Sequence, residues 1–291
     1  MNERSLKKLE ARIVHPSEGG ESRLATDTVR EAARLFQKHG ILLLENSLER
    51  RLIENIRDDF LRSYASKSPE EIRKTCLHVG HRRYMFTIQL ESPYMDPALY
   101  AAPLVFPIVQ ALLGKHCIIQ SIGVVCAYPG SEIQHVHRDN PPLFPEIGGF
   151  SAMCPPYAMH VVIPLVDLDE TTGSTAVWEG SHRAGIGASE TQLPKEGSKL
   201  LDASSMVWAR MGDCYFMDFR LLHAGTANIS AQPRPLLYLV YSRPWFEDRS
   251  NFNMQLPLQI SREEYERIPR ENLGLFRTAV AEDKRHSRTT M

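Results

Sequence analysis

The sequence lacks the features that mark secreted, membrane-spanning or polyanion-binding proteins. It contains no run of about 18 apolar residues, so no membrane-spanning helix is expected. The N-terminal segment is charged and lacks the apolar core that a signal peptide has. Lys and Arg total 34 against 35 Asp and Glu, and a net charge of −1 gives no overall attraction for nucleic acid or anionic membranes. We therefore expect a cytoplasmic protein whose partner is neither a nucleic acid nor a membrane.

Cysteine is also scarce. The five cysteines are scattered, odd in number and free of any CxxC pair, which argues against a disulfide framework and against a four-cysteine zinc site. None stands in a recognisable nucleophile motif, and the GxSxG signature of serine hydrolases is missing. A hydrolase with a Ser or Cys nucleophile is thus a disfavoured alternative. No glycine-rich loop that would cradle the phosphates of CoA occurs either.

The hydrophobic pattern predicts helices first and strands afterwards. Helices are expected at 26–40, 47–64, 104–113 and 260–268, and a buried strand at 41–45. Short β-branched segments separated by turn residues are expected to be strands at 116–130, 157–168, 175–180, 205–210, 214–219 and 234–246. This order favours a barrel or a double-sheet jelly roll, mainly β with flanking helices. We expect one domain over 1–291, with a loosely ordered start (1–22), a β core (116–246) and a helical tail (247–291).

A candidate metal site lies in the segment QHVHRDN, residues 134–140. His137 and Asp139 are two residues apart, so in a strand both side chains point to the same face. His223, after a later strand, can supply a second imidazole. Two histidines and one carboxylate on one face of a metal leave three positions open, as in the facial triad of non-haem Fe(II) oxygenases. Such an HxD pair alone also fits an ion pair or a turn hydrogen bond.

Arg234 adds to this hypothesis because it begins the strand that follows His223. An always-charged guanidinium binds a carboxylate in bidentate fashion. An inward-facing arginine on a strand needs an anionic partner, since an unpaired buried charge is costly. A dicarboxylate co-substrate that chelates the metal at one end can place its other end at this arginine.

Four segments together resemble the phytanoyl-CoA dioxygenase family of Fe(II)/2-oxoglutarate enzymes. They are HRD (137–139), GSTAVWEGSHR (173–183), LLHAGTANIS (221–230) and RPLLYLVYSRPWF (234–246). The resemblance runs from about residue 40 to residue 246. Two positions depart from the family's usual pattern, because Thr172 replaces an Asn and Glu179 replaces a Pro.

Membership of this family implies a double-stranded β-helix core of the cupin type. It implies Fe(II) bound by His137, Asp139 and His223, with 2-oxoglutarate and O₂ as co-substrates. It further implies that Arg234 holds the distal carboxylate of 2-oxoglutarate, and that Gln120 is directed at its other end. Related halogenases replace the carboxylate ligand with a small residue, so Asp139 argues for oxygenation or desaturation over halogenation.

The resemblance says less about the substrate. We expect a small, largely apolar molecule of secondary metabolism, hydroxylated, desaturated or rearranged at an unactivated C–H bond with release of succinate and CO₂. An acyl-CoA or lipid hydroxylase of the same family is one alternative. A non-oxygenase, cupin-like metal-binding protein is another, although Arg234 would then have no evident task. The oligomeric state stays open, with a homodimer among the expectations.

Several residues are candidates for the substrate pocket, although each also fits ordinary packing. His135 lies two residues before His137 and is expected beside the iron, not bound to it. His160 is expected to be a satisfied core or surface histidine. The candidates for the pocket are Tyr84, Phe86, His135, Trp208 and Phe246.

Overall fold

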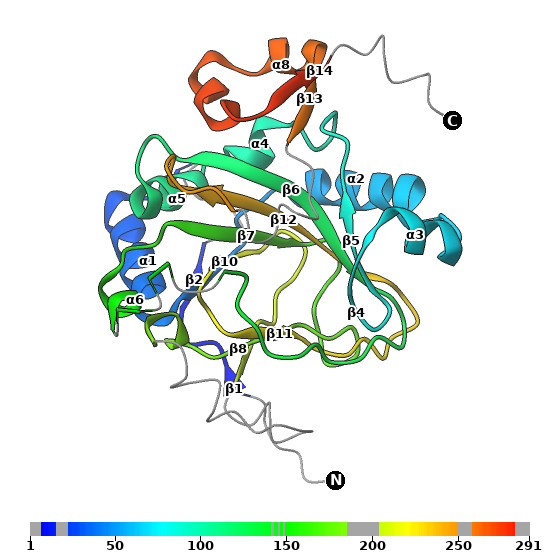
Figure 1. Ribbon diagram of the computed structural model, residues 1–291, viewed down its shortest axis with the longest axis horizontal. Coiled ribbons are helices and arrows are strands. Elements are labelled where there is room, and N and C mark those ends of the chain that lie inside the picture. Colours follow the sequence, from blue (N-terminus) through cyan, green and yellow to red (C-terminus); the bar gives the residue numbers. More distant parts are fainter. Residues whose placement is uncertain are drawn as a thin grey trace.

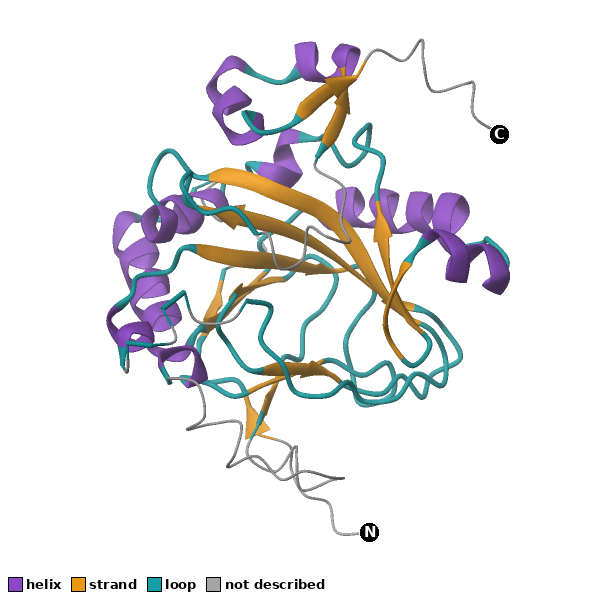
Figure 2. Cartoon of the chain, viewed as in Figure 1, coloured by secondary structure: helices purple, strands orange, loops and turns teal. Residues whose placement is uncertain are grey.

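The computed structural model describes residues 7–15, 23–140, 143–144, 146–147, 149–184, 204–248 and 258–282. Two β-sheets lie opposite each other, and helices cover the outer face of the larger one (Figures 1 and 2). One hydrophobic cluster joins residues of both sheets, and the largest cluster joins the larger sheet to the helices. The mainly β, double-stranded β-helix fold predicted from the sequence is confirmed.

The larger sheet has eight strands among the described residues. In spatial order they are β2 (Arg12–Val14), β3 (Ile41–Glu45), β10 (Cys214–Asp218), β7 (Ala158–Pro164), β12 (Arg234–Ser242), β6 (Ile118–Ala127), β5 (Arg83–Thr87) and β4 (Leu77–Gly80). The smaller sheet consists of β1 (Lys7–Lys8), β9 (Ser205–Met206), β8 (Thr175–Val177) and β11 (His223–Gly225). The central pairs β10–β7, β7–β12 and β12–β6 are antiparallel.

The helices precede most of the sheet, as expected. They are α1 (Thr26–His39), α2 (Arg50–Phe60), η1 (Leu61–Ala65), α3 (Pro69–Thr75), α4 (Pro97–Tyr100) and α5 (Phe106–Leu113), followed later by α6 (Phe150–Met153) and η2 (Ser181–Arg183). Gly40 ends α1 in the left-handed region, with φ of 76°. A side chain there would collide with His182 and Leu221, so the helix can stop and turn into β3 only at a residue without Cβ. No helix in the described part of the chain is both long and apolar enough to cross a bilayer.

The structure differs from the sequence-based expectations at several places. The hairpin of β4 and β5 was not expected, because its Gly, His and Arg residues interrupt the apolar alternation. The C-terminal region is not purely helical: β13 (Gln259–Ser261) pairs in parallel with β14 (Val280–Glu282), alongside α8 (Arg262–Arg267) and η4 (Arg270–Phe276). Within the first 22 residues, β1 and β2 are strands, while 1–6 and 16–22 lie outside the described residues, as do 249–257 and 283–291 of the tail.

The register of three neighbouring strands decides which side chains reach the space between the sheets. Arg83 of β5 and Arg234 of β12 both lie opposite Ala127 of the intervening β6. Residues paired across strands point to the same face, so both arginines face the smaller sheet. The alternation turns Tyr84 and Phe86 to the opposite, helix-covered face.

Candidate active site

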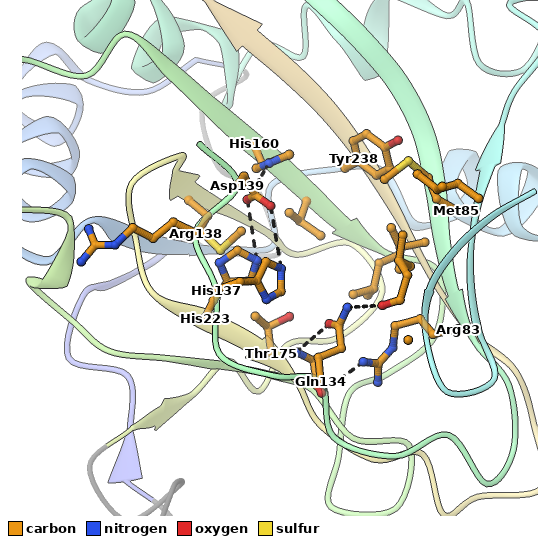
Figure 3. Close-up of a pocket in the computed structure, with 18 of the residues that line it drawn as sticks. Arg83, Met85, Gln134, His137, Arg138, Asp139, His160, Thr175, His223 and Tyr238 are labelled. Atoms are coloured by element: carbon orange, nitrogen blue, oxygen red, sulfur yellow. Dashed lines mark hydrogen bonds and ion pairs between the residues drawn. The ribbon is translucent and has the colours of Figure 1, made fainter. Parts of the chain in front are cut away.

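A cavity of about 660 Å³ lies between the two sheets. Inward-facing residues of the larger sheet, β8 and β11 of the smaller sheet, and the loop 131–139 line it (Figure 3). The three predicted metal ligands and Arg234 are all among the lining residues. The structure therefore brings together the residues on which the sequence-based hypothesis depends.

The ligand atoms of His137, Asp139 and His223 all lie within 4.8 Å of one another. Nε2 of His137 is 4.0 Å from Oδ1 of Asp139, and Nε2 of His223 is 3.6 Å from Oδ2. The expectation that the HxD pair belongs to a regular strand is wrong, because this loop touches β11 through an isolated bridge. His137 N–H donates to the His223 carbonyl at 3.0 Å, and His223 N–H donates to the His137 carbonyl at 2.9 Å. This reciprocal pair holds the two imidazoles side by side.

Hydrogen bonds to the backbone orient both imidazoles in the same way. Nδ1 of His137 is 2.9 Å from the carbonyl oxygen of His135, and Nδ1 of His223 is 3.0 Å from that of Leu221. A carbonyl only accepts, so each Nδ1 carries the proton and each Nε2 keeps a lone pair for a metal. Burial, followed by the charge of His223, lowers the pKa of His137. The neutral imidazole is the form that binds a metal.

Asp139 is held as a carboxylate by its surroundings. Burial acts to raise its pKa, but His223, His160 and His137 together keep the pKa below its usual range. Its backbone N–H donates to the Phe219 carbonyl at 3.1 Å, which ties the loop to the turn between β10 and β11. A carboxylate that stays ionised can serve as the anionic ligand of a divalent cation.

His160 lies in the site, contrary to the expectation of a core or surface histidine. It stands on β7, and its Nε2 lies 3.0 Å from Oδ2 of Asp139 (Figure 3). Since a carboxylate only accepts, Nε2 is the donor. The ring stacks on Phe219 with a centroid distance of 4.6 Å. No signal in the sequence points to this contact, because β7 and the 131–139 loop meet only through tertiary structure.

Arg234 is a buried cation in the cavity wall. Its side chain is 2% exposed, and Nη1 donates to the carbonyls of Thr172, Ser174 and Thr226 at 3.2–3.3 Å. Its Nε has no hydrogen-bond partner among the described residues. Burial lowers its pKa to about 10, so the charge remains at neutral pH. Gly173 makes room for this arginine, since a Cβ there would come within 2.5 Å of Nη1.

Two hydroxyl groups lie near this arginine. Thr175 and Tyr215 both line the cavity, and their side-chain oxygens are 2.9 Å apart. Burial raises the pKa of Tyr215 to about 12, so the phenol stays protonated and able to donate. A guanidinium with hydroxyl donors beside it is a suitable surrounding for a carboxylate.

Arg83 is a second buried arginine in the cavity, and the sequence-based hypothesis missed it. It is 1% exposed and donates to the carbonyls of Glu132, Gly225 and Thr226. The signal in the sequence is weak, because Arg83 directly follows Arg82 and stands at the start of the apolar residues YMF. Without knowledge of the β5–β6–β12 order, nothing connects it to Arg234.

Gln120 does not reach the cavity. Its Nε2 donates to Ser242 Oγ at 2.8 Å and to the Phe246 carbonyl at 2.6 Å, and it is not among the described residues that line the cavity. The pairing of β6 with β12 shifts register between Val240 and Tyr241, at the level of Gln120. Ser121 lines the cavity in its place.

Four of the five expected substrate residues are likewise absent from the described cavity lining. Phe86 packs edge-on against Phe60 of α2, with Tyr84 on the same face. Trp208 packs against a small hydrophobic cluster that contains Trp178. Phe246 packs against Tyr157, with a distance of 4.7 Å between the ring centroids. For Tyr84 and Phe86 the physical reason is side-chain alternation in β5, which the sequence leaves undetermined by one residue. Trp208 and Phe246 lie beyond the ends of β9 and β12, which are shorter than the expected strands. Of the aromatic residues, the lining includes Tyr215, Phe219 and Tyr238.

His135 does line the cavity. Its side chain is exposed, and its ring centroid is 5.1 Å from that of His137. Its carbonyl oxygen accepts the Nδ1 proton of His137. The residue therefore orients a ligand through its backbone, while its ring lies at the exposed end of the cavity. Arg138, between the two ligands of the HxD pair, extends away from them and donates to the Arg220 carbonyl (Figure 3).

Comparison with known proteins bears on this site. The sequence profile of the phytanoyl-CoA dioxygenase (PhyH) family matches residues 36–236. The chain belongs to the phytanoyl-CoA dioxygenase family. It is thus a non-haem Fe(II)/2-oxoglutarate-dependent dioxygenase, with Fe(II) as its metal and 2-oxoglutarate and O₂ as co-substrates. Two imidazole nitrogens and one carboxylate oxygen on one face of a cavity fit that metal.

Solved structures with a similar fold include those of three proteins. SnoN, a non-haem alpha-ketoglutarate-dependent epimerase from nogalamycin biosynthesis, is 20% identical, with a TM-score of 0.56 over 76% of this chain and 87% of SnoN. ThoJ, a non-haem monooxygenase in complex with nickel, is 19% identical, with a TM-score of 0.52 over 73% of this chain and 77% of ThoJ. HygX from Streptomyces hygroscopicus, with nickel and 2-oxoglutarate bound, is 16% identical, with a TM-score of 0.54 over 77% of this chain and 89% of HygX. At these identities the likeness shows a shared fold.

Proposed function

We propose that His137, Asp139 and His223 hold the Fe(II), and that Arg234 binds the distal carboxylate of 2-oxoglutarate. One observation carries this proposal. Three suitable ligand atoms lie within 4.8 Å of one another in the wall of a cavity. The same cavity is lined by the buried Arg234, and no carboxylate contributes to the shift of its pKa. Neither feature alone needs a co-substrate, but a chelating dicarboxylate accounts for both.

The chain's own residues position the reactants. The bound iron, together with 2-oxoglutarate and O₂, supplies the oxidising chemistry. The reciprocal backbone bonds between His137 and His223 set the spacing of the imidazoles, and His160 restrains the carboxylate of Asp139. Arg234 orients the co-substrate, and the apolar wall excludes water around the reacting C–H bond.

We propose further that the substrate is a small, largely apolar molecule of secondary metabolism, which is hydroxylated, desaturated or rearranged. A cavity of about 660 Å³ is within the size range of small-molecule sites. Met85, Phe219 and Val240 form part of its apolar wall. Exposed His78 and Glu132 at the cavity edge allow polar substituents on the part of the substrate nearest to solvent. The similar fold of SnoN, an enzyme of nogalamycin biosynthesis, supports a substrate from secondary metabolism.

Anaerobic metal titration tests the ligand assignment. Wild-type protein is expected to bind one equivalent of Fe(II) without oxygen and, once O₂ is admitted, to form succinate from 2-oxoglutarate in the presence of substrate. His137→Ala, Asp139→Ala and His223→Ala should each abolish turnover with a largely unchanged fold, which circular dichroism can check. Full iron binding and activity in Asp139→Ala would refute the triad. A panel of apolar natural-product scaffolds and acyl-CoA thioesters then separates the proposed substrate class from the acyl-CoA alternative.

A further inference from the structure

A phenol stands in the apolar wall of the cavity. Tyr238 of β12 lines the cavity and is 7% exposed (Figure 3). Leu236 and Val240, two residues away on either side, point to the same face of the strand, and Val162 of β7 lies directly opposite Tyr238. The hydroxyl of Tyr238 is thus a polar group set among aliphatic side chains.

The hydroxyl of Tyr238 makes no hydrogen bond with any other described residue. The two other tyrosines on β10 and β12 each have one, Tyr215 at 2.9 Å and Tyr241 at 2.6 Å. Burial, and then the charge of Asp139, raises the pKa of Tyr238, so the phenol stays protonated and is a donor. A buried donor needs an acceptor, and since no described residue supplies one, the acceptor must come from the contents of the cavity.

Gly123 of β6 makes room for this phenol. The two residues are paired across the strands, and a Cβ at Gly123 would lie 2.5 Å from the hydroxyl oxygen of Tyr238 and 2.9 Å from the Phe86 carbonyl oxygen. Gly123 has no positive φ, so it is the lack of space and not the backbone that requires a glycine. The ring of Tyr238 also packs edge-on against His160, with centroids 5.8 Å apart. The hydroxyl is therefore held in place before a ligand arrives, which limits the entropy lost on binding.

Tyr238 lies on the metal side of the cavity, away from the co-substrate arginine. His160 contacts both the ring of Tyr238 and the carboxylate of Asp139, the latter at 3.0 Å. Arg234 is four residues earlier on β12, which corresponds to about 13 Å along a strand. A group that binds the phenol therefore belongs to a molecule close to the metal, and not to the distal carboxylate of 2-oxoglutarate.

We propose that Tyr238 is a substrate-binding residue whose hydroxyl donates a hydrogen bond to a carbonyl oxygen of the prime substrate. This inference rests on the proposed function, since it assumes that the substrate enters this cavity. It narrows the largely apolar substrate to one with a carbonyl group close to the reacting carbon. Analogues that lack the acceptor are rejected, because they leave the buried donor without a partner. The same bond orients the substrate, so that one C–H bond in particular faces the metal.

The test compares ligands that differ only at this carbonyl. 1-Tetralone and tetralin, and 9-fluorenone and fluorene, are pairs of ring compounds in which C=O replaces CH₂. Each is titrated calorimetrically into full-length protein loaded with Ni(II) and 2-oxoglutarate, so the readout is affinity and not turnover. Tyr238→Phe removes the hydroxyl and keeps the ring over Gly123. Tyr241→Phe is the matched control, because Tyr241 lies on the same strand but outside the described cavity lining.

The ratio of ketone affinity to hydrocarbon affinity is the measured quantity, because it cancels changes that affect both ligands alike. Tyr238→Phe is expected to lower this ratio by about 5- to 10-fold, as the loss of one hydrogen bond predicts. The affinity for the hydrocarbons and for 2-oxoglutarate should stay within about twofold of the wild type. Tyr241→Phe should keep the wild-type ratio, although it loses a buried hydrogen bond to the Tyr100 carbonyl.

Two results would overturn the inference alone. The first is an unchanged ratio for both pairs in Tyr238→Phe, which includes the case that the wild type binds none of the four compounds. The second is a loss of 2-oxoglutarate affinity larger than the loss of ketone affinity, which would assign the phenol to the co-substrate. Failure of the wild-type protein to bind 2-oxoglutarate is a distinct outcome, because it would refute the proposed function and the inference with it.

Discussion

Replacing His160 by Phe should weaken metal binding although His160 is not one of the proposed ligands. The perturbation removes one hydrogen bond, from Nε2 to Oδ2 of Asp139 at 3.0 Å. It keeps an aromatic ring of similar size stacked on Phe219, so the ring packing, with a centroid distance of 4.6 Å in the wild type, is largely preserved. Without this donor the carboxylate of Asp139 can rotate, and metal binding must then restrict a side chain that the wild type already holds.

The size of the effect follows from the geometry. A hydrogen bond to a charged group contributes about 1.5–3 kcal/mol, or about 10- to 150-fold in affinity. The side chain of His160 is 15% exposed and Asp139 keeps its bond to Phe219 through the backbone, so the lower part of this range applies. We expect a loss of about 10- to 30-fold, within the range seen when a partner of a metal ligand is removed.

Competition against a chelator of known affinity measures this loss for Fe(II) and Ni(II). His160→Gln can still donate to Asp139 and should recover part of the affinity. His116→Phe provides the control, because His116 is exposed and absent from the described lining of the cavity. Wild-type metal affinity in His160→Phe, together with an unchanged fold, would refute the reasoning that this bond restrains the carboxylate.

Two further predictions separate the co-substrate site from the core. Arg234→Gln should raise the KM for 2-oxoglutarate by about 30-fold or more, since removing one partner of a buried charge pair costs about 2–5 kcal/mol. The KM for the prime substrate should change little, and equal effects on both KM values would count against the role of Arg234. Phe86→Ala should lower the free energy of unfolding by about 3–5 kcal/mol in urea denaturation, because Phe86 is 1% exposed in the helix-covered core. Its KM for the prime substrate should stay unchanged, and a large rise in that KM with wild-type stability would place Phe86 in the substrate site after all.

The chemistry of the site was predictable because it depends on short sequence spacing. His137 and Asp139 lie two residues apart, His223 follows the expected strand 214–219, and Arg234 begins a strand whose apolar pattern is clear. The local pattern therefore specifies which donor types occur and where strands begin. The expected regular strand at the HxD pair was unnecessary, since one pair of backbone hydrogen bonds to His223 suffices to align the ligands.

The errors at Tyr84, Phe86 and Gln120 have a common physical origin in side-chain alternation. In β5 the sequence RYMFT offers two sets of side chains, and pairing with β6 turns Arg83 and Met85 inward and Tyr84 and Phe86 outward. A shift of one residue would reverse this choice. The register irregularity between β6 and β12 has a similar effect at Gln120.

By itself, the sequence determined the β-rich class, the HxD pair and the arginine expected to meet a carboxylate. These features rest on local periodicity and on the chemistry of single side chains. Only the tertiary structure decided that His160 contacts Asp139 and that Arg83 lies beside Arg234. The first contact joins β7 to the 131–139 loop, and the second brings together β5 and β12, which are distant in sequence. Both depend on strand order and register, which arise when the whole sheet buries its apolar faces together.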